Sequence, residues 1–131
     1  MTKCRTAMAE AQFTVFVVDD DQSVLASLKL LIESSGYRAL TFKSAEDLLD
    51  SVRKEKPCCL VLDIRLPGMS GFKLQERLLE SQTAVPVIFI TGQDREGTEA
   101  EAMRLGAIAY LRKPFDEECL FDAIQSAARR I

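Results

Sequence analysis

Residues 13–21 read FTVFVVDDD, a short apolar run that ends in three consecutive acids. β-Branched and aromatic residues favour extended chain, and an apolar run without polar alternation is typical of a strand buried on both faces. Asp19, Asp20 and Asp21 mark the end of that run. The stretch therefore predicts a buried strand that leads into an acidic loop.

A helix is expected directly after this loop, with Asp21 as a candidate N-cap. Apolar residues recur at helical spacing as far as Ser35 and Gly36, and glycine can adopt the left-handed conformation that closes a helix. The recurring apolar positions are Val24, Leu25, Leu28, Leu31 and Ile32.

The unit of strand and helix then repeats along the rest of the chain. Further strands are expected at residues 37–42, 58–62, 86–90 and 107–111, each followed by a helix. Buried parallel strands that alternate with helices predict an α/β fold, with a single doubly wound five-stranded sheet in three layers. A chain of 131 residues fits one domain, placed at residues 13–131, and residues 1–12 are expected to form a flexible N-terminal extension.

Composition excludes several classes of function. The chain contains no histidine, so any mechanism that needs an imidazole from this chain is excluded. The net charge of −3 provides no basic surface for nucleic acid. No apolar run approaches the roughly 20 residues of a membrane span, so a cytoplasmic protein is expected. The cysteines match neither a zinc-ligand spacing nor a redox pair; they are Cys4, Cys58, Cys59 and Cys119.

Polar residues follow four of the five predicted strands. Open parallel sheets bind ligands beside the carboxyl ends of their strands, at a topological switch point. The residues expected there are the acids 19–21 after the first strand, Asp63 after the third, Thr91 after the fourth and Lys113 after the fifth. The second strand ends without an acid.

These residues favour phosphoryl transfer. If Asp19, Asp20 and Asp63 converge, their mutual repulsion calls for a cation, and oxygen ligands favour Mg²⁺ or Mn²⁺. Thr91 and Lys113 can then contact phosphoryl oxygens, because such a transfer needs mainly positioning and fixed positive charge. Carboxylates form acyl phosphates in several enzyme classes, so Asp63 is the candidate nucleophile.

Four motifs, taken together, resemble the receiver domain of bacterial two-component response regulators over about residues 13–130. They read VVDDD after the first strand, LDIRLPGMSG around Asp63, ITG after the fourth strand and YLRKPF after the fifth. The stretch ITGQD makes the chain most similar to the FixJ-like subgroup. The resemblance implies the flavodoxin-like (CheY-like) strand order 2-1-3-4-5.

The resemblance also assigns roles to residues at the site. It implies that Asp63 is the phosphoacceptor, that Asp20 binds the metal directly and that Asp19 acts on the metal largely through water. The backbone carbonyl of Arg65 would be a further metal ligand. Lys113 would pair with the phosphoryl group, across a Lys113-Pro114 bond that is cis in the family.

Other implied roles concern signalling. Thr91 and Tyr110 resemble the switch pair, and Arg65 and Gln93 stand where they can tune dephosphorylation. The implied partner is a histidine kinase or phosphotransfer protein, and the implied protein is a signalling phosphoacceptor, not an enzyme. Homodimers would form through the face of the fourth helix, fifth strand and fifth helix, running from about Gly97 through Arg112 to Arg130. Members of the subgroup usually carry a C-terminal DNA-binding domain, so this chain would be either a stand-alone receiver or part of a longer protein.

Each residue alone has a simpler explanation. An aspartate such as Asp63 is often a turn or cap residue, Thr91 a turn residue and Tyr110 a packing residue. Rival functions are a haloacid-dehalogenase-like phosphatase, which expects D-x-D where this chain has Asp63-Ile64-Arg65, and a flavodoxin-like electron carrier. A receiver-like interaction module that works without phosphate is the third alternative.

Overall fold

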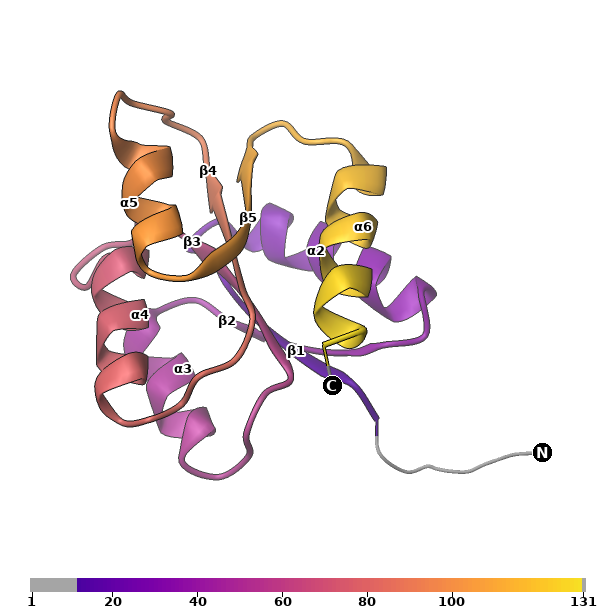
Figure 1. The fold of residues 1–131 in the computed structure, drawn as a ribbon. Coiled ribbons are helices and arrows are strands. Elements are labelled where there is room, and N and C mark those ends of the chain that lie inside the picture. Colours follow the sequence, from indigo (N-terminus) through magenta and orange to yellow (C-terminus); the bar gives the residue numbers. More distant parts are fainter. Residues whose placement is uncertain (1–11, 131) are drawn as a thin grey trace.

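The computed structural model describes residues 12–130, which form a parallel sheet between two layers of helices (Figure 1). The sheet has the order β2-β1-β3-β4-β5. Its strands are β1 (Thr14–Val18), β2 (Arg38–Phe42), β3 (Cys59–Asp63), β4 (Val87–Thr91) and β5 (Ala107–Arg112). The predicted α/β fold class and strand order are confirmed. No strand end differs from its predicted position by more than one residue.

Helices cover both faces of the sheet (Figure 1). One layer contains α2 (Gln22–Ser34) and α6 (Glu117–Ala128), and the other contains α3 (Ala45–Val52), α4 (Gly71–Glu80) and α5 (Thr98–Arg104). Three of these helices begin with a side-chain cap. The side chains of Asp21, Ser44 and Ser70 accept hydrogen bonds from backbone N–H groups and so cap α2, α3 and α4. The predicted capping role of Asp21 is therefore confirmed.

Strand residues alternate between two hydrophobic clusters, one on each face of the sheet. In β1, Val15 and Val17 belong to the cluster beneath α2 and α6, whereas Phe16 and Val18 belong to the cluster beneath α3, α4 and α5. Every residue of β1, β3 and β4 is buried. Burial on both faces explains why these strands appear in the sequence as continuous apolar runs.

The carboxyl ends of the strands meet at one edge of the sheet. Val18 pairs with Leu62 in β3, and Asp63 pairs with Ile90 in β4, so the residues that follow β1 stand beside the end of β3. The peptide bond between Lys113 and Pro114, just after β5, is cis as the resemblance implied. The sequence motifs thus gather at a single edge.

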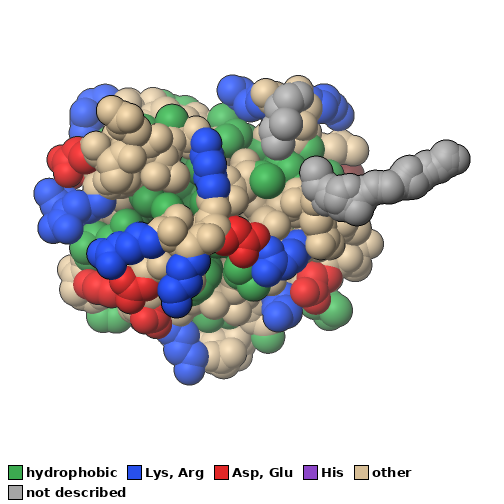
Figure 2. Space-filling view, turned by 90° about the horizontal axis from the view of Figure 1, so that it is seen from below, with side chains coloured by type: hydrophobic (Ala, Val, Ile, Leu, Met, Phe, Trp, Pro, Cys, Tyr) green, Lys and Arg blue, Asp and Glu red, His purple; other side chains and the backbone are tan. Residues whose placement is uncertain are grey.

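The opposite edge of the sheet is chemically mixed. Figure 2 views the molecule from that side and shows Lys and Arg side chains scattered over the face, with Asp and Glu between them. Within residues 12–130, no helix has both the length and the apolar character needed to cross a membrane. The N-terminal extension predicted for residues 1–12 lies outside the described residues, apart from Gln12.

Candidate functional site

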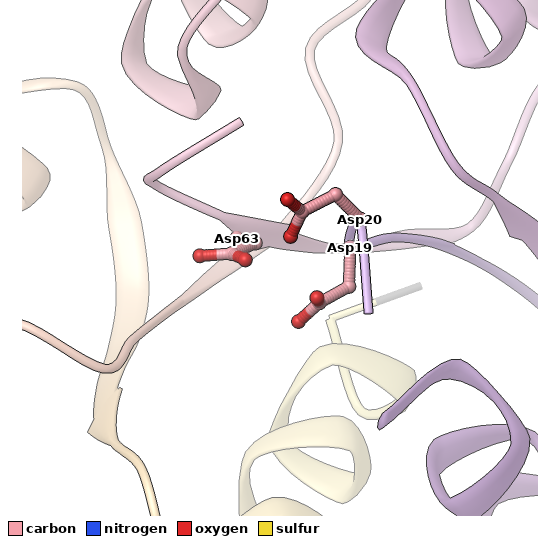
Figure 3. A group of neighbouring side chains, drawn as sticks. All are labelled: Asp19, Asp20 and Asp63. Atoms are coloured by element: carbon pink, nitrogen blue, oxygen red, sulfur yellow. The ribbon is translucent and has the colours of Figure 1, made fainter. Parts of the chain in front are cut away.

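Three carboxylates face a common space beyond the ends of β1 and β3 (Figure 3). One oxygen from each of Asp19, Asp20 and Asp63 lies within 4.8 Å of the other two. Asp19 is fully buried and Asp63 is 3% exposed, whereas Asp20 is exposed to solvent. The predicted acidic cluster therefore exists, with two buried members and one open to solvent.

The backbone fixes both buried acids. The N–H of Asp19 donates to the carbonyl of Phe42 at 3.2 Å, which extends the β1–β2 ladder by one residue. One oxygen of Asp19 then accepts from the N–H of Asp21 at 2.9 Å, and one oxygen of Asp63 accepts from the N–H of Arg65 at 3.1 Å. Each side chain is held by the loop that follows its own strand.

Lys113 joins the two buried acids. Its ammonium donates to Asp19 Oδ2 at 2.7 Å and to Asp63 Oδ2 at 3.3 Å. The backbone N–H of Lys113 donates to the carbonyl of Thr91 at 2.7 Å, which places the base of this side chain beside the end of β4. The chain segments after β1, β3, β4 and β5 thus converge on one pocket, as their positions at the strand ends predicted.

The electrostatic balance of the pocket is negative, because one ammonium faces three carboxylates. Burial and the charge of Asp19 raise the pKa of Asp63 to about 6, although Lys113 and the hydrogen bond from Arg65 act in the opposite direction. Burial lowers the pKa of Lys113, but its hydrogen bond to Asp19 and the charges of both acids outweigh burial and raise it overall. A second positive charge near Asp63 would relieve this imbalance.

The donor set fits a hard divalent cation. All candidate ligand atoms in the cluster are carboxylate oxygens, and the ammonium of Lys113 already occupies one oxygen of each buried acid. Mg²⁺ prefers one or two carboxylates together with water and phosphate oxygens. The solvent-exposed Asp20 leaves room for such water ligands. The cluster has the chemistry expected of a magnesium site.

Thr91 and the predicted tuning residues form a second group beside the acids. The Thr91 hydroxyl donates to the carbonyl of Gln93 and accepts from its N–H, both at 3.1 Å, so in this arrangement it bonds to its own loop. The side-chain oxygen of Gln93 accepts from the guanidinium of Arg65 and, at 2.9 Å, from that of Arg95. Arg65 and Gln93, which were both predicted to tune dephosphorylation, are therefore direct partners.

Tyr110 has a partner that sequence reasoning missed. Its hydroxyl donates to Asp94 at 2.7 Å, and Asp94 also accepts from the guanidinium of Arg112. Burial, followed by the hydrogen bond with Asp94, raises the pKa of Tyr110 to about 12. Asp94 lies in a loop of polar residues without periodicity, and only the order Thr91-Gly92-Gln93-Asp94 before a helix marks its position.

Comparison with known proteins places these residues in a family. The model of the family described as "Response regulator receiver domain" matches residues 15–125. Nodulation protein W of Bradyrhizobium diazoefficiens is 41% identical over 122 residues, which cover 93% of this chain and 54% of that protein. Response regulator protein TmoT of Ectopseudomonas mendocina is 38% identical over 125 residues, covering 95% of this chain and 57% of that protein. The chain spans somewhat more than half the length of these relatives.

Solved structures agree with the family match. The structure described as FixJ-N superposes with a TM-score of 0.84 at 32% identity and covers 92% of this chain and 97% of that one. The structure of response regulator StyR gives a TM-score of 0.83 at 46% identity, covering 89% of this chain and 59% of that one. Likeness in fold therefore extends over nearly all the described residues.

Proposed function

The chain belongs to the response regulator receiver domain family, and from this membership we propose that Asp63 accepts a phosphoryl group from a partner histidine kinase or phosphotransfer protein. A receiver domain of a two-component system is a signalling phosphoacceptor. The rest of the proposal concerns how the residues of this chain carry out that role, which partner they serve and what they control.

The transfer uses one oxygen of the Asp63 carboxylate as nucleophile. A bond forms between that oxygen and phosphorus while the bond between phosphorus and the leaving atom of the donor breaks, and the leaving group departs with the electron pair. The product is an acyl phosphate on Asp63. Because the chain supplies the nucleophile and the positive charge, it promotes this transfer itself and also the slower hydrolysis that ends the signal.

The observation that carries the proposal is the bridge from Lys113 to both buried acids. An ammonium 3.3 Å from Asp63 Oδ2 stands where the oxygens of a phosphoryl group on that carboxylate would gather. Fixed positive charge of this kind stabilises the charge spread over the transferring group. Asp19 holds the ammonium in place through the shorter 2.7 Å contact.

A magnesium ion held by Asp19, Asp20, Asp63 and the backbone carbonyl of Arg65 would neutralise charge on both the carboxylate and the phosphoryl oxygens. The residues of the chain prepare for this: Asp20 supplies an exposed oxygen, and the N–H of Arg65 orients Asp63. Mn²⁺ has the same ligand preferences and is the expected substitute.

The output of the signal belongs to the same proposal. Relatives of this chain include transcriptional regulatory protein FixJ of Bradyrhizobium diazoefficiens, so we extend transcriptional control to the protein in which this receiver acts. Phosphate on Asp63 would draw the hydroxyl of Thr91 toward the pocket and allow Tyr110 to move, which alters the surface formed by α5, β5 and α6. A cytoplasmic location follows from the proposed partner.

The experiment is incubation of the chain with acetyl phosphate and Mg²⁺, followed by intact mass measurement. The expected result is one phosphate adduct in the wild type and none in Asp63→Asn or in the presence of EDTA. Asp50→Asn is the matched control, because it makes the same chemical change at a side chain on α3 that is 68% exposed and is not one of the clustered acids. A wild-type chain that acquires no adduct, or an adduct that survives in Asp63→Asn, would contradict the proposal.

The pair of Arg65 and Gln93 is proposed to set the lifetime of the acyl phosphate. The guanidinium of Arg65 donates to the Gln93 side chain, and both lie on loops that border the acids. Replacing either residue by alanine removes this bridge and opens the pocket to the water that hydrolyses the adduct. We expect the dephosphorylation rate to rise by about tenfold, while Mg²⁺ affinity, measured by calorimetry, changes by less than about threefold. The reverse pattern would contradict this division of roles.

A further inference from the structure

A polar cluster outside the acidic pocket ties the loop after β4 to the end of β5. Asp94 in that loop accepts from the hydroxyl of Tyr110 at 2.7 Å and from Nε of Arg112. Arg112 also donates to Glu99 in the first turn of α5 at 2.9 Å, and its guanidinium lies 5.3 Å from the centre of the Tyr110 ring. Asp94 in the loop and Glu99 at the start of α5 are therefore both held to β5.

The same loop controls where the Thr91 hydroxyl points. A hydroxyl has a single proton to donate, and Thr91 gives that proton to the carbonyl of Gln93. To donate to a phosphoryl group on Asp63, Thr91 must release this carbonyl. Releasing it breaks a hydrogen bond that closes the turn at residues 91–93, and Asp94 follows this turn directly.

The two sets of contacts therefore compete. In the described arrangement, Thr91 bonds to its own loop while Asp94 bonds to Tyr110 and Arg112. In the second arrangement, the Thr91 hydroxyl donates to phosphate in place of Gln93, and the loop shifts. The contacts of Asp94 are made in the first arrangement, so any free energy they contribute favours it over the second.

We propose that Asp94 and Arg112 are positioning residues that form a latch on Tyr110, hold the loop after β4 in its unphosphorylated arrangement and so oppose phosphorylation of Asp63. This inference rests on the proposed function and adds a regulatory element to it. Neither residue touches the phosphoryl group; both act through Tyr110 and through the loop that carries Thr91.

The size of the effect follows from the kind of bonds involved. Asp94 accepts two hydrogen bonds, one of them from a guanidinium, at the surface of the protein. Hydrogen bonds with charged partners stabilise more than neutral ones, while solvent weakens exposed ion pairs. By linkage, losing the latch should raise the apparent affinity for a phosphate mimic by about five- to thirtyfold.

The experiment compares beryllofluoride affinity, in the presence of Mg²⁺, between the wild type and Asp94→Ala in the full chain. Asp50→Ala is the matched control, because it removes an aspartate that forms an exposed ion pair with Arg53 and lies outside the α5, β5 and α6 face. Affinity is measured by calorimetry. A spectroscopic measurement uses a Tyr37→Phe background, which leaves Tyr110 as the only tyrosine of the chain, and follows its ring signals by NMR.

The expected result has three parts. Asp94→Ala binds beryllofluoride more tightly and is phosphorylated faster by acetyl phosphate, whereas Asp50→Ala matches the wild type. The NMR signals of Tyr110 in ligand-free Asp94→Ala shift toward their position in the beryllofluoride-bound wild type. In a double-mutant cycle, Tyr110→Phe adds little to Asp94→Ala, because the hydroxyl it removes has already lost its acceptor.

Two results would overturn the latch. Affinity in Asp94→Ala that equals or falls below that of a normally binding wild type removes the inference and leaves the proposed function standing. A wild type that binds no beryllofluoride and accepts no phosphate removes the proposed function, and the latch with it.

Discussion

At Asp63, burial favours the neutral carboxyl group, whereas the proposed reaction needs the carboxylate. Its pKa is raised to about 6, first by burial and then by the charge of Asp19. Between the ordinary value of 3.8 and this value, the folded chain binds more protons than the unfolded chain does. The stabilisation linked to this proton is complete below the lower pKa and is lost as the pH rises through about 6.

A pH-dependent difference in stability between the wild type and Asp63→Asn follows. Without metal, the variant should be more stable by about 3 kcal/mol at pH 8, because it avoids burying a charge, and the difference should largely disappear near pH 4. Urea unfolding in EDTA at both pH values measures it. Lys113 titrates far above this range and does not affect the comparison. A constant difference across pH would contradict the assignment, and Asp50→Asn should show no difference at either pH.

Gly71 is a second residue whose identity depends on its neighbours. A Cβ atom at this position would lie 2.3 Å from the carbonyl oxygen of Asp63 and 3.0 Å from the Cα of Ile64, both backbone atoms. Gly71→Ala must therefore push α4 away from the end of β3, at a cost of roughly 1 to 3 kcal/mol.

Gly92→Ala provides the matched control for this prediction. A Cβ at Gly92 would meet only Cδ of Lys113, at an ordinary 3.9 Å. Urea unfolding should thus separate the two alanine variants clearly, with Gly71→Ala the less stable. Equal midpoints would mean that α4 can move at no cost.

At the scale of the elements, the start of α2 divides adjacent acids between structure and binding. Asp21 caps the helix by accepting from the N–H of Ser23 at 2.9 Å and of Val24 at 3.4 Å. Asp20 makes none of these capping bonds and points its carboxylate toward Asp63 (Figure 3).

The two alanine variants should accordingly fail in different assays. Asp21→Ala should lose about 1 kcal/mol of stability in EDTA and keep its Mg²⁺ affinity, because a helix N-cap is lost. Asp20→Ala should keep or gain stability, because one of three repelling charges is removed, and should lose Mg²⁺ binding. Urea unfolding and calorimetry measure the two effects. Loss of Mg²⁺ binding in Asp21→Ala alone would reverse the assignment.

Periodicity in the sequence was sufficient to predict most of these elements. The strands were visible because every residue of β1, β3 and β4 is buried, which leaves continuous apolar runs. Their order in the sheet came from the family resemblance, since no local pattern records which strands are neighbours. The need for glycine at position 71, the first residue of α4, was not visible in the sequence, because it depends on packing against the backbone of Asp63.

The residues of the pocket could be predicted from the sequence to a similar extent. The sequence was enough to predict that Asp19, Asp63 and Lys113 lie close together, because parallel strands end at one edge of the sheet. The burial of Asp19 beside an exposed Asp20 could not, since adjacent identical residues give no hint of which one faces the core. The bond between Tyr110 and Asp94 depends on the path of an irregular loop, and no periodic signal describes such a path.

At the scale of the whole molecule, the proposed switch surface can be tested as an interface. Met103 on α5 is 46% exposed, within the α5, β5 and α6 face, while Leu30 is 71% exposed on α2, a helix outside that face (Figure 1). With beryllofluoride and Mg²⁺ we expect the mass in solution, measured by light scattering, to rise from 14.6 kDa to about twice that value.

The two exposed apolar side chains serve as test and control for this prediction. Met103→Glu should prevent the increase in mass by placing a charge in the interface, and Leu30→Glu should leave it intact. Asp63→Asn should remain monomeric under all conditions. A mass that stays at one chain in the activated wild type would reject dimerisation through any face.

The sheet divides the hydrophobic core into two clusters, one on each of its faces. Tyr110 belongs to the cluster beneath α3, α4 and α5, and the cluster beneath α2 and α6 meets it only across the sheet. Repacking on one side can therefore leave the other side as it was. A core substitution beneath α2 and α6 is thus expected to spare the packing around Tyr110.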